Sequence, residues 1–186
     1  MMISGTLFAN GVASLDPVRL LGAGELNSDL GKPSKDQYEI YIYTADGKVR
    51  VERIVPMEVS HTDERHFSVL TAAVVDIVRI EVVKNAVPLK MQAKMMARSQ
   101  LRVSNWTSPN PALIQITGHS VQLTWDSARY TWADATYLAA DGQRRVLGLS
   151  LQGGRKSLQL PANVVGGQLE VSLSDGLNST LYVKQM

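Results

Sequence analysis

Residues 61–66 hold the densest group of potential metal ligands in this sequence, with His61, Asp63, Glu64 and His66 close together. Imidazole and carboxylate groups are common zinc ligands. Two histidines five positions apart do not suit a helical zinc pair, because their side chains diverge by about 140° around a helix of ~3.6 residues per turn. We therefore interpret this segment as a solvated turn between strands and assign no metal site to it.

Carboxylate and amide oxygens near predicted strand ends could instead bind calcium. The candidates are Asp126, Asp134, Asp141, Asp175 and Asn178. Calcium takes about six to eight oxygen ligands, and the ligand spacing of an EF-hand loop is not present. Asp and Asn are also common turn residues. Turn formation is the favoured interpretation, so no cofactor is expected, and calcium stays open as the alternative.

Aromatic side chains concentrated after residue 100 suggest a third chemistry, the stacking of flat rings on sugars. The candidate ligand-binding residues are Trp106, Tyr130 and Trp132. Tyr130 and Trp132 are two positions apart, so in a strand they share one face, which is either an inward core pair or an exposed platform. Core packing is the favoured interpretation, because aromatic residues are highly buried on average.

Trp125 follows Val121 and Leu123 at alternate positions, so in a strand all three point to one side. Apolar sets with this period face a core. We expect Trp125 to lie between two sheets, with Val121, Leu123, Leu149 and Val171 among its neighbours.

The sequence contains no recognisable catalytic constellation. Neither the Gly-x-Ser-x-Gly motif of a nucleophilic serine nor the His-Glu-x-x-His motif of a zinc peptidase occurs. Cysteine is absent, which removes thiol catalysis, disulfides and zinc–thiolate sites. We assign no catalytic residue and expect that the chain is not an enzyme, although it could be a non-catalytic part of a larger exported hydrolase.

Charge is nearly balanced, with 19 Lys and Arg against 17 Asp and Glu and a net charge of +2. The densest basic runs are the pairs Arg144-Arg145 and Arg155-Lys156. A nucleic-acid-binding face normally clusters more cations, so nucleic acid is not an expected partner. No apolar stretch reaches about 18 residues, so membrane insertion is not expected either.

Short runs of alternating apolar residues, separated by turns, fill most of the chain. The last third contains six of them, at residues 121–125, 135–140, 145–151, 156–160, 168–174 and 180–183. Seven more precede them, at residues 2–7, 13–21, 38–43, 48–54, 67–75, 77–83 and 87–91. This cadence, without a helical period between the runs, predicts an all-β chain of two consecutive antiparallel β-sandwiches. Only residues 90–100 could be helical, and a strand running into a linker is the favoured interpretation there.

The strongest hairpin signal joins residues 38–43 to residues 48–54 through Ala45-Asp46-Gly47. A similar Ala-Asp-Gly turn recurs at residues 140–142. The second run of the first hairpin has two different faces, with Val49 and Val51 on one and Lys48, Arg50 and Glu52 on the other. We expect the valine face to point toward the core.

Residues 105–111 form the best domain boundary, because Pro109 and Pro111 remove backbone donors and favour extended geometry. The predicted organisation is a first β-sandwich domain at residues 1–104, a linker at 105–111 and a second domain at 112–186.

Four segments of the second predicted domain carry a family resemblance. They are Val-Gln-Leu-Thr-Trp-Asp at 121–126, the Asp-Gly hairpin at 141–142, Ser-Leu-Gln-Leu-Pro at 157–161, and the segment 166–176 that ends in Ser-Asp-Gly. In these positions the chain resembles fibronectin type III and related immunoglobulin-like modules, over about residues 111–186. The resemblance implies a β-sandwich fold with a core tryptophan on an early strand, and it implies no particular ligand.

The two-module arrangement also resembles the C-terminal accessory regions of large exported bacterial proteins, some of them metallopeptidases. This resemblance implies a non-catalytic adhesion or spacer module that positions or targets a neighbouring domain. The expected partner is that neighbouring domain, a cell-surface protein or a glycan. The expected location is extracellular, on the cell surface or periplasmic, with this chain as a piece of a longer protein. The alternative is a carbohydrate-binding module that uses exposed aromatic residues of the second domain.

Overall fold

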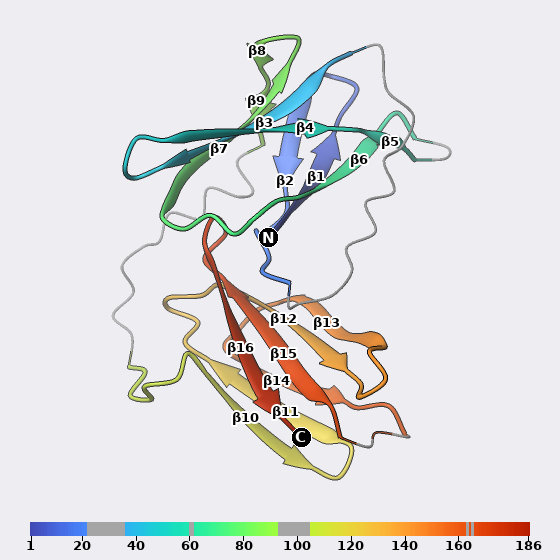
Figure 1. The fold of residues 1–186 in the computed structure, drawn as a ribbon, viewed down its shortest axis with the longest axis vertical. Coiled ribbons are helices and arrows are strands. Elements are labelled where there is room, and N and C mark those ends of the chain that lie inside the picture. The colour runs from blue at the N-terminus through green and yellow to red at the C-terminus, as the bar shows by residue number, and fades with distance from the viewer. Residues whose placement is uncertain (22–35, 60–61, 93–104, 163, 165) are drawn as a thin grey trace. The chain divides into compact units, whose positions relative to one another are not determined.

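The computed structural model describes residues 1–21, 36–59, 62–92, 105–162, 164 and 166–186. Every regular element among them is a β-strand, so the predicted all-β fold class is confirmed (Figure 1). The chain forms two compact units, one containing Met1–Val18 and Glu25–Ala97 and the other containing Arg19–Gly24 and Arg98–Met186. No helix in the described segments is long and apolar enough to cross a membrane.

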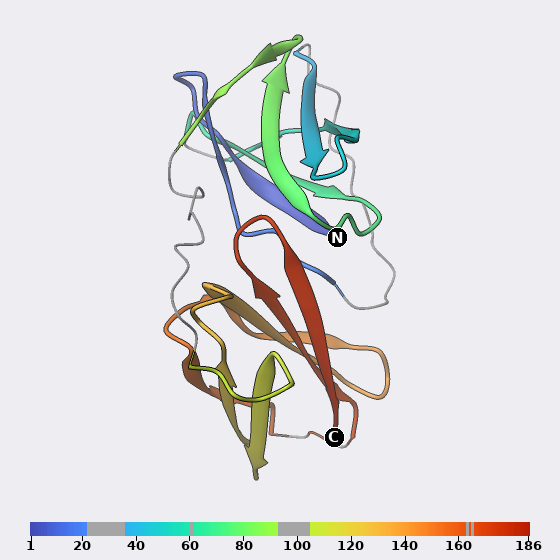
Figure 2. The ribbon, with the colours of Figure 1, turned by 90° about the vertical axis from the view of Figure 1, so that its left-hand side faces the viewer.

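The first unit is a sandwich of two sheets (Figures 1 and 2). One sheet has the order β5-β6-β1-β2-β9, with β1 at Met2–Leu7, β2 at Val12–Leu15, β5 at Met57–Glu58, β6 at Arg65–Leu70 and β9 at Lys90–Met91. The other has the order β4-β3-β7-β8, with β3 at Tyr38–Thr44, β4 at Val49–Ile54, β7 at Ile77–Lys84 and β8 at Val87–Pro88. All pairings are antiparallel except that of β2 with β9.

Alternate residues of these strands fill the core of the first unit. Ile3 of β1, Ile40 and Ile42 of β3, Phe67 of β6 and Val82 of β7 are almost wholly buried. Gly5 leaves room for the Phe67 ring, because a Cβ at Gly5 would collide with the Ser14 carbonyl oxygen and lie 2.8 Å from Phe67 Cζ. A larger residue at this position would disturb the pairing of β1 with β2 and displace the Phe67 ring of the neighbouring strand β6.

The predicted orientation of β4 is wrong. Val49 and Val51 are 49% and 46% exposed, and they lie opposite the half-buried Tyr43 and Tyr41. The buried residues of β3 set the phase of the hairpin, because residues directly opposite each other share a face. Ile42 and Ile40 face Arg50 and Glu52, so the charged residues of β4 are on the core side of this edge strand.

The lengths of several predicted strands also differ. The run 13–21 is a strand only at β2, the run 67–75 ends with β6 at Leu70, and the run 87–91 is divided into β8 and β9. The short strand β5 is not predicted. The helical alternative at 90–100 meets β9 at its start, and residues 93–100 lie outside the described segments.

The described residues of the second unit form seven strands in two sheets. One has the order β10-β11-β14, with β10 at Ala112–Thr117, β11 at Ser120–Trp125 and β14 at Arg155–Gln159. The other has the order β13-β12-β15-β16, with β12 at Trp132–Leu138, β13 at Arg144–Leu151, β15 at Gln168–Ser174 and β16 at Ser179–Gln185. The fourth strand thus pairs with the third, which is an immunoglobulin-like arrangement of the fibronectin type III kind. All six predicted runs are strands, and β10 is the one that the sequence analysis missed.

The four-stranded sheets of the two units have the same strand order along the chain. The first hairpins of the two sheets also have the same turn hydrogen bond. Gly47 N–H donates to the Thr44 carbonyl at 3.0 Å, and Gly142 N–H donates to the Ala139 carbonyl at 3.0 Å. The recurring Ala-Asp-Gly turn therefore occupies equivalent places in two equivalent sheets.

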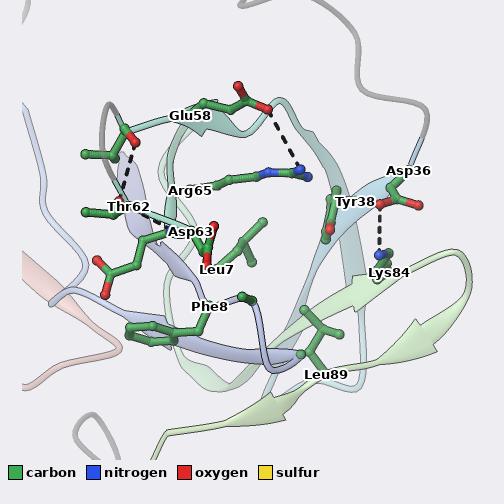
Figure 3. A pocket seen from close by; sticks show the side chains of 14 residues that line it. Leu7, Phe8, Asp36, Tyr38, Glu58, Thr62, Asp63, Arg65, Lys84 and Leu89 are labelled. Carbon is green, nitrogen blue, oxygen red and sulfur yellow. Dashed lines mark hydrogen bonds and ion pairs between the residues drawn. The ribbon is translucent and has the colours of Figure 1, made fainter.

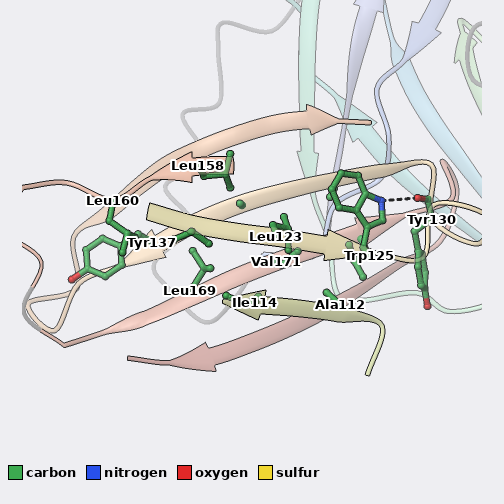
Figure 4. Close-up of a cluster of buried hydrophobic side chains, with 14 residues drawn as sticks. Ala112, Ile114, Leu123, Trp125, Tyr130, Tyr137, Leu158, Leu160, Leu169 and Val171 are labelled. Carbon is green, nitrogen blue, oxygen red and sulfur yellow. Dashed lines mark hydrogen bonds between the residues drawn. The ribbon is translucent and has the colours of Figure 1, made fainter. Parts of the chain in front are cut away.

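Trp125 is 2% exposed and belongs to the core of the second unit, as predicted, and it lies toward one end of the buried cluster, beside Tyr130 (Figure 4). Val121, Leu123 and Val171 belong to the same buried cluster. The prediction that Leu149 is a neighbour of Trp125 is wrong, because Leu149 is 52% exposed. The β12–β13 pairing contains a bulge in which Ala133 faces Leu151 but Ala135 faces Gly148, and this extra residue turns Leu149 outward.

Residues 19–21 belong to the second unit through specific contacts. Arg19 Nε lies 2.7 Å from Asp134 Oδ2, and Leu20 N–H donates to Ser172 Oγ at 3.1 Å. The predicted division assigned these residues to the first domain. The expected boundary near residue 104 falls partly in 93–104, outside the described segments.

The burial of Trp125 gives a first prediction. Trp125→Ala should lower the free energy of unfolding of the second unit by about 3–5 kcal/mol, because it removes a large core side chain and leaves a cavity. All three tryptophans lie in this unit, so the fluorescence of Trp106 and Trp132 during urea unfolding of the full chain measures it. Leu113→Ala, at an exposed site on β10, is the control and should change stability by less than about 0.5 kcal/mol. Equal effects would contradict the core assignment.

The β7–β8 turn gives a second prediction. Asn85 and Ala86 connect Lys84 to Val87 with φ angles of 49° and 67°, a two-residue hairpin turn that favours Asn-Gly. Ala86→Gly should stabilise the first unit by about 0.5–1 kcal/mol, because the left-handed conformation strains an alanine. Ala73→Gly, at an exposed site without a positive φ, should not stabilise. Thermal unfolding of both variants distinguishes the two outcomes.

Candidate functional site

A cleft of 730 Å³ at one end of the first unit is the candidate functional site (Figure 3). Four parts of the chain form it: residues 7–9 and Gly11 at the end of β1 and in the turn that follows, Asp36 and Tyr38 at the start of β3, residues 58–59 and 62–65 from β5 to β6, and Lys84 and Leu89 on either side of the β7–β8 turn. β1 and β7 end at this edge, whereas β3 and β6 begin there. Antiparallel pairing thus brings residues distant in sequence to one end of the sandwich.

Arg65 projects into the middle of the cleft from the first position of β6 (Figure 3). The strand alternates, so Arg65 lies on the same face as the buried Phe67, and His66 points to the opposite face. Arg65 Nη2 lies 3.8 Å from Glu58 Oε1, and the Glu58 side chain is largely exposed. The guanidinium group is thus held by a long and solvated ion pair.

Lys84 and Asp36 form a tighter pair on the other side of the cleft. Lys84 Nζ lies 2.8 Å from Asp36 Oδ2 and 5.6 Å from the centre of the Tyr38 ring. The hydrogen bond from Lys84 lowers the pKa of the Asp36 carboxyl, and the same bond raises the pKa of Lys84. Both groups are therefore ionised at neutral pH, and the contribution of the pair is lost as the pH falls through the pKa of Asp36.

Apolar side chains form the floor of the cleft, and charged side chains surround it. Leu7 and Tyr38 are buried, and Phe8 and Leu89 are partly exposed. The charged lining consists of two cations and four carboxylates: Arg65 and Lys84 against Asp36, Glu58, Asp63 and Glu64. The arrangement suits a ligand that combines apolar groups with charges of both signs.

The fold brings together only part of segment 61–66, which the sequence analysis considered as a metal site and interpreted as a solvated turn. Asp63 and Glu64 line the cleft, whereas His66 lies on the other face with its Nδ1 3.3 Å from Thr6 Oγ1. His61 lies outside the described segments. Among the described residues, no group of three His, Asp or Glu side chains could hold a metal ion.

The calcium candidates bond to the backbone or to a cation. Asp126 Oδ1 accepts from Ala128 N–H at 3.1 Å, and Asp141 Oδ1 accepts from Gln143 N–H at 3.0 Å. Asp175 Oδ1 accepts from the N–H groups of Leu177 and Asn178. Asp134 is buried and paired with Arg19. Three of the four aspartates thus act as turn formers.

The three aromatic candidates have different environments. Tyr130 is 8% exposed and belongs to the core, so it is not part of an exposed stacking platform. Its carbonyl accepts a hydrogen bond from Trp125 Nε1 at 2.9 Å, which fixes it inward. Trp132 is half-buried at the start of β12, and the half-buried Trp106 donates from Nε1 to the Asn110 carbonyl at 2.8 Å. Sugar binding by Trp106 and Trp132 stays a prediction.

Sequence reasoning considered the segment around Arg65 but did not find the site. Tyr38 and Lys84 face each other in the β3–β7 pairing, and the ends of the predicted strands could have shown that they share an edge. The convergence of β1 and β6 at the same edge depends on how the two sheets pack, which a linear pattern does not specify.

No protein-family profile matches the sequence, and no curated protein matches it. Among solved structures, a segment of two fibronectin type III domains from chicken tenascin aligns with 98% of this chain and 93% of that chain. The sequence identity is 11% and the TM-score is 0.31. A superposition this loose does not establish a common topology, so the fold of each unit stands on its own strand pairings.

The Lys84–Asp36 pair gives a third prediction. In Lys84→Met, the pKa of the Asp36 carboxyl should rise, because the hydrogen bond that lowers it is lost. Carboxyl carbon chemical shifts followed by NMR across the acid range measure this pKa in both proteins. Asp46 is the internal control, because Lys48 lowers its pKa in the same way and should do so in both. An unchanged Asp36 titration would show that the pair does not form.

Proposed function

We propose that this chain is a non-catalytic accessory module of an exported bacterial protein, and that it positions or targets a neighbouring domain. It does so by holding a protein segment in the cleft of the first unit. Two sandwiches with separate cores are suited to this role, because rigid sheets support binding residues on the loops that join them. The exported location rests on the resemblance to accessory regions described above.

The observation that carries the proposal is the weak internal pairing of Arg65. Charge-assisted hydrogen bonds between nitrogen and oxygen are about 2.7–2.9 Å long. The Arg65–Glu58 distance is 3.8 Å, whereas the Lys84–Asp36 distance is 2.8 Å. Arg65 therefore keeps donors that can form a short, bidentate bond with an incoming carboxylate.

The surroundings of Arg65 define the chemistry of the partner. A carboxylate between Arg65 and Lys84 would lie beside the Tyr38 ring, and apolar side chains next to it would contact Leu7, Phe8 and Leu89. The acidic side chains at Glu58, Asp63 and Glu64 oppose a dianion such as phosphate more strongly than a single carboxylate. They also favour a basic residue next to the carboxylate. The partner segment is thus a peptide with an acidic residue, apolar neighbours and an adjacent Lys or Arg.

Peptide selection tests this function. A random peptide library selected on the full wild-type chain should enrich sequences that pair Asp or Glu with apolar residues. The affinity of those peptides should fall by about tenfold in Arg65→Glu, because an attractive ion pair becomes repulsive. Isothermal titration calorimetry with the enriched peptides measures the change.

Lys156→Glu is the matched control, since it makes the same charge change at an exposed position of β14 in the other unit. It should leave peptide affinity unchanged. Peptides that bind Arg65→Glu as well as the wild type, or an enrichment without acidic residues, would contradict the proposed site.

A further inference from the structure

We propose that two copies of this chain associate through β4, with the two strands paired antiparallel about a twofold axis at Val51. β4 is an edge strand, and its one partner among the described strands is β3. An edge strand presents unpaired N–H and C=O groups, which are a template for another strand. The inference is independent of the cleft and of its proposed ligand.

The hydrogen-bond phase of β4 favours this axis. Thr44 N–H donates to the Lys48 carbonyl at 3.1 Å, so Lys48 bonds toward β3. Main-chain groups along an antiparallel strand alternate in direction, so Arg50 and Glu52 also bond toward β3. The N–H and C=O groups of Val49, Val51 and Arg53 then point outward, and a second β4 centred on Val51 would meet them in register.

The solvent-exposed face of β4 carries two apolar side chains next to this axis. Val49 and Val51 are both exposed, and Tyr43 and Tyr41 lie opposite them on β3. In the paired arrangement Val51 lies opposite Val51 of the second copy and beside its own Tyr41. Pairing thus covers apolar surface as well as backbone groups.

Charge complementarity selects this register over its neighbours. With the axis at Val51, each Arg50 lies opposite Glu52 of the other copy. An axis at Arg50 or at Glu52 would place like charges opposite each other, and a shift of one residue would place Arg50 opposite Arg53. Like charges directly opposite each other destabilise a strand pair. Hydrogen bonding from Thr71, the largest cause, and from Arg50 lowers the pKa of Glu52, which keeps it ionised.

Complementary charge reversals test the pairing on the full chain by sedimentation velocity over a range of concentrations. The wild type should show a reversible dimer. Arg50→Glu alone and Glu52→Arg alone should each be monomeric, because both cross-strand pairs between positions 50 and 52 then consist of like charges. An equimolar mixture of the two variants should form heterodimers, because the carboxylate introduced at position 50 of one variant then lies opposite the guanidinium introduced at position 52 of the other. An effect confined to one chain cannot produce this recovery.

Arg79→Glu is the matched control, because Arg79 pairs with Glu81 at 2.9 Å on the interior strand β7. It should dimerise like the wild type. Val51→Pro is a second test variant, because it removes an N–H group that points outward and makes no hydrogen bond to β3. This variant should be monomeric, and its circular dichroism spectrum should be unchanged. A wild type that stays monomeric, or a mixture that does not associate, overturns the proposal.

Discussion

The second unit depends on one hydrogen bond inside its core, which the buried indole of Trp125 donates. Its ring fills the space between the two sheets, so its N–H group has no access to water and needs a partner inside the protein. The Tyr130 carbonyl supplies that partner at 2.9 Å. Tyr130 N–H in turn donates to the Asp126 carbonyl at 2.8 Å. The turn from β11 to β12 is therefore set by the need to satisfy one buried donor.

A similar requirement explains the buried charges of this unit. Asp134 lies on the outer face of β12 but is buried, because residues 19–21 cover that part of the sheet. Its two oxygens are used by Arg19 and by the Ser150 N–H group, which donates at 2.6 Å. Ser150 has a φ of 49° in the bulge of β13. Removal of one charge from such a pair would leave the other buried and uncompensated, which is costly.

In the first unit, the scaffold and the charged part of the candidate site use different residues. Ile3, Ile40, Ile42 and Val82 hold the two sheets together. The charged residues of the cleft lie at strand ends and in turns, where the backbone is solvated and side chains are not needed for packing. The positive φ of Ala86 lies in the hairpin that carries Lys84 and Leu89 into the cleft. Local strain at such a turn is common where function fixes the position of side chains.

The pattern of apolar residues was enough to predict the all-β class, most strands and the burial of Trp125, because period-two alternation is a local property of the chain. The sequence also located the Asp-Gly hairpins, whose geometry depends on adjacent residues. The sequence did not show which face of β4 points inward, because the alternation of valines and charged residues is compatible with either orientation of the strand. The pairing of β4 with β3 sets that orientation.

The exposure of Leu149 could not be predicted from the sequence, because a bulge depends on the register of two paired strands. The same holds for the contact of Arg19 with Asp134 and for the cleft around Arg65. These features join residues far apart in the chain, and their positions follow from how the sheets pack against each other, about which a pattern of neighbouring residues carries no information.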